Sequence, residues 1–126
     1  MKVKKFEIKA GTYPYTIRVI ICRNIKTVVD YVNRKQYRKG SEKYKPSDFK
    51  NSLGRFCRHD KYCPVIWIPK KPKTARQLCT VAHEVLHAVF ANMEWFGITY
   101  NRNSEEAYTY LHVHLMEQFL NKCGIK

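Results

Sequence analysis

The segment TARQLCTVAHEVLHAVFANMEWFG, from Thr74 to Gly97, predicts a long amphipathic helix. Thr74 and Gln77 have the T-x-x-Q spacing of a capping box, in which two side chains satisfy free backbone N–H groups at a helix start. Gly97 suits a helix end. The apolar residues between these ends recur at intervals of three and four, which is the spacing of one helix face. They are Leu78, Val81, Ala82, Val85, Leu86, Val89, Phe90 and Met93.

Three polar residues, His83, Glu84 and His87, interrupt this apolar helix. Burying such groups costs several kcal/mol unless partners satisfy them. Residues four apart share a helix face, so His83 and His87 can direct two ring nitrogens at one ion. Glu84 is rotated by about 100° and can flank that ion without binding it. The H-E-x-x-H spacing therefore predicts a Zn²⁺ site with Glu84 as the general base for a zinc-activated water. The alternative is a pair of histidines with ordinary packing or surface roles.

A catalytic zinc ion needs a third protein ligand and one position left for water. Four residues downstream of the motif are candidates: Glu105, Glu106, His112 and His114. His112 and His114 are two residues apart and face different sides of a helix, so they cannot easily share an ion. We expect both histidines to have surface or packing roles.

The H-E-x-x-H helix, followed by Ser104-Glu-Glu-Ala107, resembles the gluzincin branch of zinc metallopeptidases. The resemblance covers residues 65–119 and implies a minimal zincin-like core, with a Glu from the following helix as third ligand. The segments WIPKKPKTARQLCTVAHEVLHAVF and SEEAYTYL also resemble small phage or prophage proteins with such a core. A length of 126 residues is that of one domain, so we expect residues 1–126 to form a single domain. The resemblance implies that this domain is of the zincin-like metallopeptidase type and acts in the host cytoplasm if the chain is phage-encoded.

The resemblance favours Glu106 as the third ligand. In gluzincins the residues three and seven positions after the ligand are small where the two helices approach. After Glu106 these are Thr109 and Val113, whereas larger side chains occupy the same positions after Glu105. Glu106 also precedes Ala107, as in the Glu-Ala pattern of thermolysin-like enzymes.

Two features qualify the assignment of Glu106. Tyr110 stands where related families often place an Asp that supports a ligating His, which puts that supporting contact in doubt. If Asn103 is the N-cap, Glu106 occupies the third helical position and can act in a capping box instead of binding metal.

The remaining pattern predicts an α+β fold. Residues 2–10 and 16–21 form a hairpin of two strands, and Asn24 caps the helix that follows. Residues 105–122 form the last helix. Between them, the apolar run at 65–68 is bounded by prolines, which suit a sheet edge or a strand end. We therefore expect a small antiparallel or mixed sheet, with an edge strand near 65–68, packed on the H-E-x-x-H helix and the Glu-bearing C-terminal helix.

An edge strand beside the zinc site implies a peptide-binding role. An extended peptide can pair with such a strand by strand addition. The residues expected to bind substrate in this way are Val65, Ile66, Trp67 and Ile68. The function predicted is a zinc-dependent metallopeptidase-like protein that hydrolyses a peptide bond in a peptide or protein substrate. The alternatives are a catalytically inactive zincin-fold regulatory or nucleic-acid-binding protein and a purely structural zinc site.

The chain is strongly basic, with 24 Lys and Arg against 10 Asp and Glu and a formal net charge of +14. Such a charge attracts acidic or phosphate-bearing partners over long range. It favours either a solvated basic face or nucleic-acid binding. The charge is spread along the first two-thirds of the chain, in residues 1–5, 34–50, 55–61 and 70–76. Residues 38–61 are polar and basic and predict a long exposed loop with a short helix near 47–53.

The five cysteines form an odd set, which indicates a reducing compartment rather than a disulfide scaffold. Cys57 and Cys63, with His59 between them, have a spacing that departs from that of structural zinc ligands, so we expect free thiols in a loop. No segment reads as a signal peptide or reaches the length of a membrane span. We therefore expect a soluble cytoplasmic protein with no membrane partner.

Overall fold

Four strands form one mixed sheet in the computed structural model, which describes residues 2–36, 43–58 and 63–125. The order across the sheet is β1-β2-β4-β3. β2 and β4 run parallel, and the other neighbouring pairs are antiparallel. The strands are β1 (Lys4–Lys9), β2 (Thr16–Ile21), β3 (Arg55–Cys57) and β4 (Val65–Ile68).

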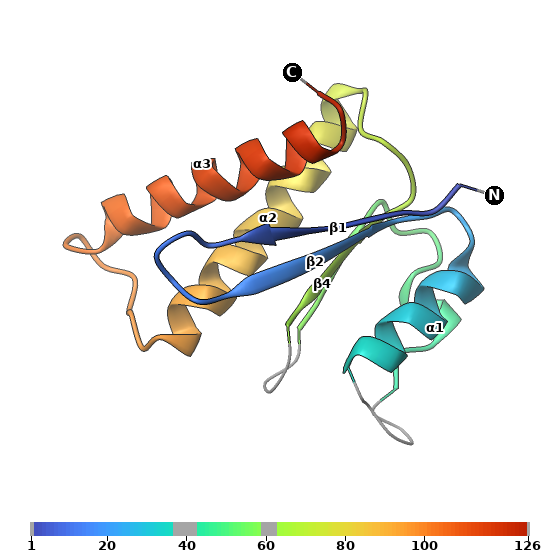
Figure 1. Cartoon of the computed structure of the whole chain (residues 1–126), viewed down its shortest axis with the longest axis horizontal. Coiled ribbons are helices and arrows are strands. Elements are labelled where there is room, and N and C mark those ends of the chain that lie inside the picture. Colours follow the sequence, from blue (N-terminus) through green and yellow to red (C-terminus); the bar gives the residue numbers. More distant parts are fainter. Residues whose placement is uncertain (1, 37–42, 59–62, 126) are drawn as a thin grey trace.

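Helices cover both faces of this sheet (Figure 1). One face carries α1 (Ile25–Gln36) and the short 3-10 helix η2 (Pro46–Asp48), and the other carries α2 (Ala75–Trp95) and α3 (Glu105–Lys122). Successive side chains of a strand point to opposite faces of the sheet, so the strands contribute to two cores, one on each face. Ile20 and Trp67 belong to the core beneath α1, while Ile66 and Ile68 pack beneath α2 and α3. The expected α+β class is confirmed.

The helix starts follow the capping signals of the sequence. The Thr74 hydroxyl accepts the Gln77 N–H at 3.2 Å, and the Gln77 side chain accepts the Thr74 N–H at 3.0 Å. At the start of α1, Asn24 Oδ1 accepts the Thr27 N–H at 3.0 Å. Gly97, just beyond α2, has a φ of 72°, which favours glycine. None of the described helices combines the length and apolar character that a membrane crossing requires.

Replacing Thr74 with Ala should lower the free energy of unfolding by about 1 kcal/mol, because a capping hydroxyl is lost at the start of α2. Urea denaturation followed by circular dichroism measures this change. Thr12→Ala, at an exposed position in the β1–β2 turn, is the matched control and should change stability by less than about 0.5 kcal/mol. Equal stability of the two variants would contradict the capping role.

The expected position of the edge strand was wrong. β4 lies between β2 and β3 and pairs with both, and its four side chains are buried. Pro64 and Pro69 lie just outside the paired residues, so their missing N–H groups remove no bond from the ladder. Both sides of β4 are thus paired, and no free edge remains for the strand addition expected at Val65, Ile66, Trp67 and Ile68. The strand next to β4 at the edge of the sheet is β3.

The expectation of a loop across residues 38–61 was wrong where β3 forms. This three-residue strand is too short to show an alternating pattern, and pairing with β4 holds it in place. Cys57 is consequently buried in a strand rather than placed in a loop. The short helix expected near 47–53 corresponds to η2 at Pro46–Asp48. Residues 37–42 and 59–62, including His59, lie outside the described residues.

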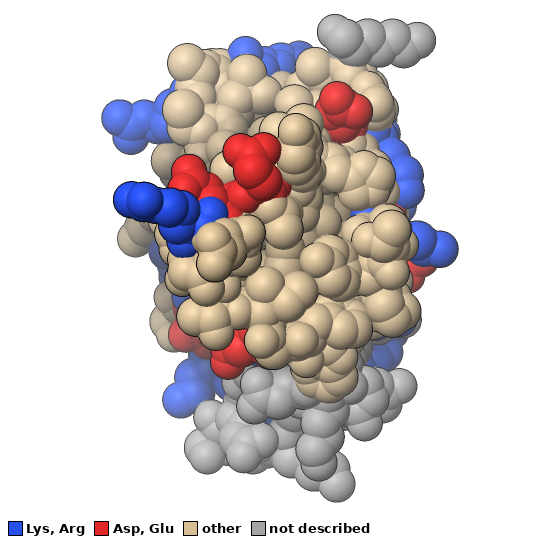
Figure 2. All heavy atoms as spheres, turned by 90° about the vertical axis from the view of Figure 1, so that its left-hand side faces the viewer, with Lys and Arg blue, Asp and Glu red and all other residues tan. Residues whose placement is uncertain are grey.

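The surface charge is unevenly distributed. Figure 2 shows the end of the molecule that carries the loop between α2 and α3, and uncharged residues cover most of this face. Exposed aromatic residues lie in this region, among them Trp95, Tyr100 and Tyr110. The visible part of this face therefore carries little of the excess of Lys and Arg.

Candidate metal centre

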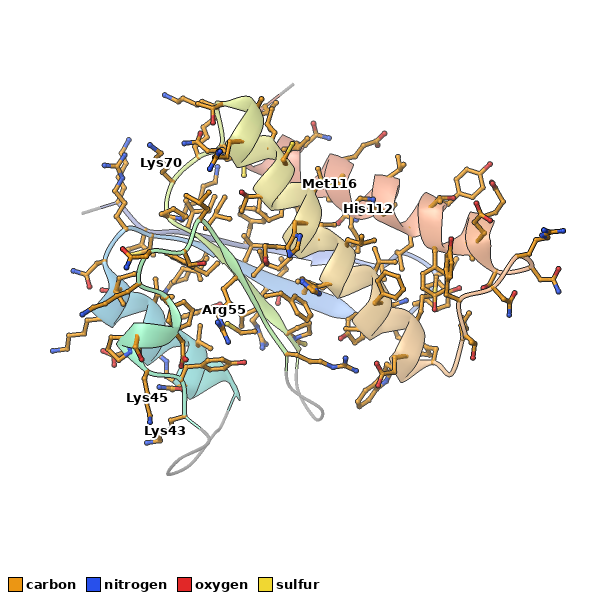
Figure 3. All side chains as sticks on the ribbon, turned by 180° about the vertical axis from the view of Figure 1, so that it is seen from behind. Lys43, Lys45, Arg55, Lys70, His112 and Met116 are labelled. Carbon is orange, nitrogen blue, oxygen red and sulfur yellow. The ribbon has the colours of Figure 1, made fainter. Side chains whose placement is uncertain are left out.

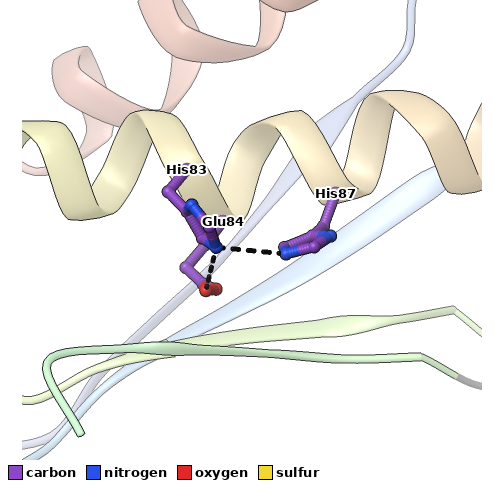
Figure 4. Close-up of side chains that lie close together, drawn as sticks. All are labelled: His83, Glu84 and His87. Atoms are coloured by element: carbon purple, nitrogen blue, oxygen red, sulfur yellow. Dashed lines mark hydrogen bonds and ion pairs between the residues drawn. The ribbon is translucent and has the colours of Figure 1, made fainter.

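The two histidines of the motif lie one turn apart on an exposed flank of α2 (Figure 4). The His83 side chain is 69% exposed, whereas that of Glu84 is 8% exposed. The one-residue offset turns Glu84 toward the sheet, as a rotation of about 100° per residue requires. The helix thus presents the imidazoles at the surface and a carboxylate behind them.

The ring nitrogens converge on one point. Nε2 of His83 and Nε2 of His87 are 3.2 Å apart. Two nitrogen ligands at about 2.0–2.1 Å from a tetrahedral zinc ion lie roughly 3.3 Å apart, so this spacing suits one shared ion. A direct imidazole–imidazole hydrogen bond, with one ring donating, gives a similar distance.

The Glu84 carboxylate lies beside the two nitrogens. Its Oε1 is 3.9 Å from Nε2 of His83, and all three candidate ligand atoms lie within 4.8 Å of one another. Glu84 Oε1 is thus farther from Nε2 of His83 than Nε2 of His87 is, and an ion shared by the two rings would have this carboxylate beside it. His83, Glu84 and His87 could hold a metal ion, and the described residues contain no other such group.

Residues of the edge strand support this arrangement. The ring of Phe56 stacks on His87, with centroids 5.9 Å apart and an interplanar angle of 20°. At Gly54, an added Cβ would lie 2.9 Å from Cγ2 of Thr80 and 3.2 Å from the Trp67 carbonyl oxygen. Glycine therefore permits the close approach of the chain to α2 just before β3. These contacts could not be predicted from the sequence, because no pattern marked β3.

The environment of Glu84 is unusual for a carboxylate. Burial raises the pKa of this carboxyl above its ordinary value, while the two imidazoles, the Phe56 N–H and Arg55 act in the opposite direction. Its Oε2 is buried and has no hydrogen-bond partner among the described residues. An unsatisfied buried acceptor costs about 1–3 kcal/mol, so the site is suited to a bound water or ion.

A shallow hollow of about 390 Å³ adjoins the site. It is lined by Leu53, Gly54, Arg76, Cys79, Thr80, His83 and Glu84. Because His83 and Glu84 are part of its lining, the hollow gives small ligands direct access to both. Arg55 is directed toward η2, where its Nη1 donates to the Asp48 carbonyl oxygen at 3.1 Å (Figure 3).

Neither Glu105 nor Glu106 joins the group. Both are exposed at the start of α3. The N-cap of α3 is Ser104 and not Asn103, so Glu106 is the second helical residue. The capping-box alternative for Glu106, which required the third position, was therefore wrong.

The helix-contact argument for Glu106 was also wrong. Tyr108 is buried at 5% exposure, and Nε2 of His112 lies 3.2 Å from the Ala82 carbonyl oxygen, between α2 and α3 (Figure 3). Thr109 and Val113 are exposed instead. The residues three and seven positions after Glu105 thus face α2, and the assignment of Glu106 as a ligand stays a prediction that rests on the resemblance.

The other two histidines in the described part of the chain lie apart from the group of His83, Glu84 and His87. His112 contributes to helix packing, and His114 is exposed near Gly11. These positions agree with the surface or packing roles expected for them.

In comparisons with known proteins, no family model, no curated protein and no solved structure matches the chain. The candidate site is therefore defined by its own geometry: two converging imidazoles and one buried carboxylate.

Proposed function

We propose that this protein is a zinc-dependent metallopeptidase-like hydrolase, with His83 and His87 as metal ligands and Glu84 as general base. One observation carries the proposal. Two Nε2 atoms converge to 3.2 Å beside a buried carboxylate whose second oxygen has no described partner. Imidazole nitrogens are favoured ligands of zinc, and the pairing of two His with Glu is common at hydrolytic zinc sites.

The residues of this chain would have distinct tasks. His83 and His87 bind the ion, and Phe56 fixes the ring plane of His87 by stacking. Bound zinc would supply a Lewis acid and lower the pKa of water to about 7. Glu84 accepts a proton from the attacking water and passes it to the leaving amine. Its raised pKa brings it closer to the range in which a general base works at neutral pH.

The peptide-binding role first expected for β4 is proposed for β3 instead. β3 is the edge strand beside α2, and an extended peptide could pair with its outer side. The Phe56 N–H already interacts with Glu84, so pairing would use the other backbone groups on that side. A peptide paired in this way would lie next to the proposed base.

Glu106 remains the proposed third ligand on the resemblance alone. If it binds the ion, Glu106→Gln should weaken zinc binding by roughly tenfold or more, while Glu105→Gln should leave it nearly unchanged. Isothermal titration with zinc distinguishes the two variants. Equal zinc affinities in both would remove Glu106 from the ligand set.

Replacing Glu84 with Gln should lower peptide hydrolysis by a factor on the order of 10² to 10⁴, because the amide cannot accept the proton of water. The substitution keeps the side-chain shape, so zinc affinity should change by less than about threefold. Cleavage of a peptide library by zinc-loaded protein, read by mass spectrometry, measures the loss. Unchanged cleavage in a zinc-binding Glu84→Gln variant would exclude the mechanism.

A second candidate function is that of an inactive zincin-fold protein which binds nucleic acid. The net charge of +14 and the presence of Tyr110 in place of a supporting Asp favour it. Binding to DNA or RNA that falls steeply with salt and survives His83→Ala would support this function over hydrolysis.

A further inference from the structure

A second region of interest lies where β2 and β4 end. These strands are adjacent and parallel, with Ile21 paired with Ile68 at their carboxyl ends. β2 continues into α1 on one face of the sheet, whereas β4 continues into α2 on the other. When successive helices leave neighbouring parallel strands on opposite faces, a crevice forms at the strand ends, and ligands commonly bind there.

A pocket of about 530 Å³ occupies this position. Its residues come from the start of β1, the ends of β2 and β4, and the end of α3. They are Lys2, Lys4, Ile21, Arg23, Pro69, Lys70, Lys71 and Cys123. Five of these eight are cationic and none is acidic, so the lining combines a positive rim with apolar walls.

The cations of this pocket lack anionic partners. None of the five forms an ion pair with a residue in the described part of the chain. Burial raises the pKa of the Cys123 thiol, and Lys4 and Lys71 oppose this shift, which places both ammonium groups near that wall. Several positive charges around one cavity favour an anion that carries more than one negative charge.

The charge offered to an anion comes from side chains that line the pocket. At the neighbouring helix starts, one N–H of each first turn already bonds a capping side chain, with the Thr27 N–H bound to Asn24 and the Gln77 N–H bound to Thr74. Side-chain cations such as Lys70, at the turn between β4 and α2 (Figure 3), would make the contacts instead. Lysine and arginine are the residues that most often bind phosphate in this way.

We propose that this pocket binds a small molecule that carries two or more phosphate groups and an apolar or planar body. A volume of about 530 Å³ is that of a small-molecule site. A nucleic-acid strand would instead need a charged groove that follows its backbone. The pocket and the hollow beside the histidines have no lining residue in common, so the two sites can be tested separately.

Isothermal titration of metal-free protein in EDTA, at constant salt, tests the proposal. The probes are inorganic triphosphate, adenosine triphosphate and a ten-nucleotide single strand. The double variant Arg23→Gln/Lys71→Gln should bind both triphosphates at least about tenfold more weakly than the wild type. The control Lys50→Gln/Arg102→Gln, at exposed positions outside the pocket, removes the same charge and should stay within about twofold of the wild type.

Three results would overturn the proposal. They are the absence of triphosphate binding by the wild type, an equal loss in both double variants, and tighter binding of the single strand than of either triphosphate. Retained triphosphate binding in His83→Ala/His87→Ala supports the separation of the two sites. Loss of triphosphate binding in that folded variant would place the phosphate at the histidines and contradict the pocket assignment.

Discussion

Replacing both His83 and His87 with Ala should lower zinc affinity by roughly 100-fold or more, because it removes the two imidazole nitrogens that converge in the structure. Both side chains are exposed, so the variant should keep the fold and its circular dichroism spectrum. Competition with a chromophoric zinc chelator measures the change in affinity.

The control for this experiment is His114→Ala. His114 is exposed on α3 and does not belong to the metal group, so its loss should leave zinc affinity within about twofold. Equal zinc affinities in the wild type and the double variant, or an equal loss in the control, would show that zinc binds elsewhere.

The largest effect on stability is expected at Trp67. Trp67→Ala should lower the free energy of unfolding by about 3–5 kcal/mol, because it leaves a cavity in the core beneath α1. The indole is 1% exposed, packs edge-to-face on Phe49 at 5.4 Å, and donates its Nε1–H to the Cys22 carbonyl oxygen at 2.8 Å. Urea denaturation measures the loss.

Trp95→Ala is the matched control for Trp67→Ala. Trp95 is 59% exposed at the end of α2, so its removal should cost less than about 1 kcal/mol. A similar loss in the free energy of unfolding in both variants would contradict the burial of the Trp67 side chain in the core beneath α1.

The helices could be predicted from the sequence because their signals are local. Capping residues and three-four spacing identified α2, and the observed bounds of α3 are those expected. The place of β4 in the sheet could not be predicted, because an apolar run indicates burial and does not name the neighbouring strands. β3 carried too few residues for any periodic signal.

In the candidate site, too, the residues of one helix could be predicted from the sequence and the residues from another strand could not. His83, Glu84 and His87 belong to one helix, so spacing alone predicted which side chains would meet. Phe56 and Gly54 reach the site from another strand, and the sequence holds no short-range signal for them. The orientation of α3 was misjudged because the spacing of small residues was used to find its contact face, whereas Tyr108 and His112 form that contact.

The most direct test of the proposed zinc centre is anomalous X-ray diffraction at the zinc edge, from crystals of the protein grown with one equivalent of zinc. The proposal predicts a single strong peak about 2.0–2.1 Å from Nε2 of both His83 and His87, with Glu84 beside the ion. The same map would identify the third ligand. Two histidine rings hydrogen-bonded to each other with no peak between them, or a peak at another site alone, would contradict the account.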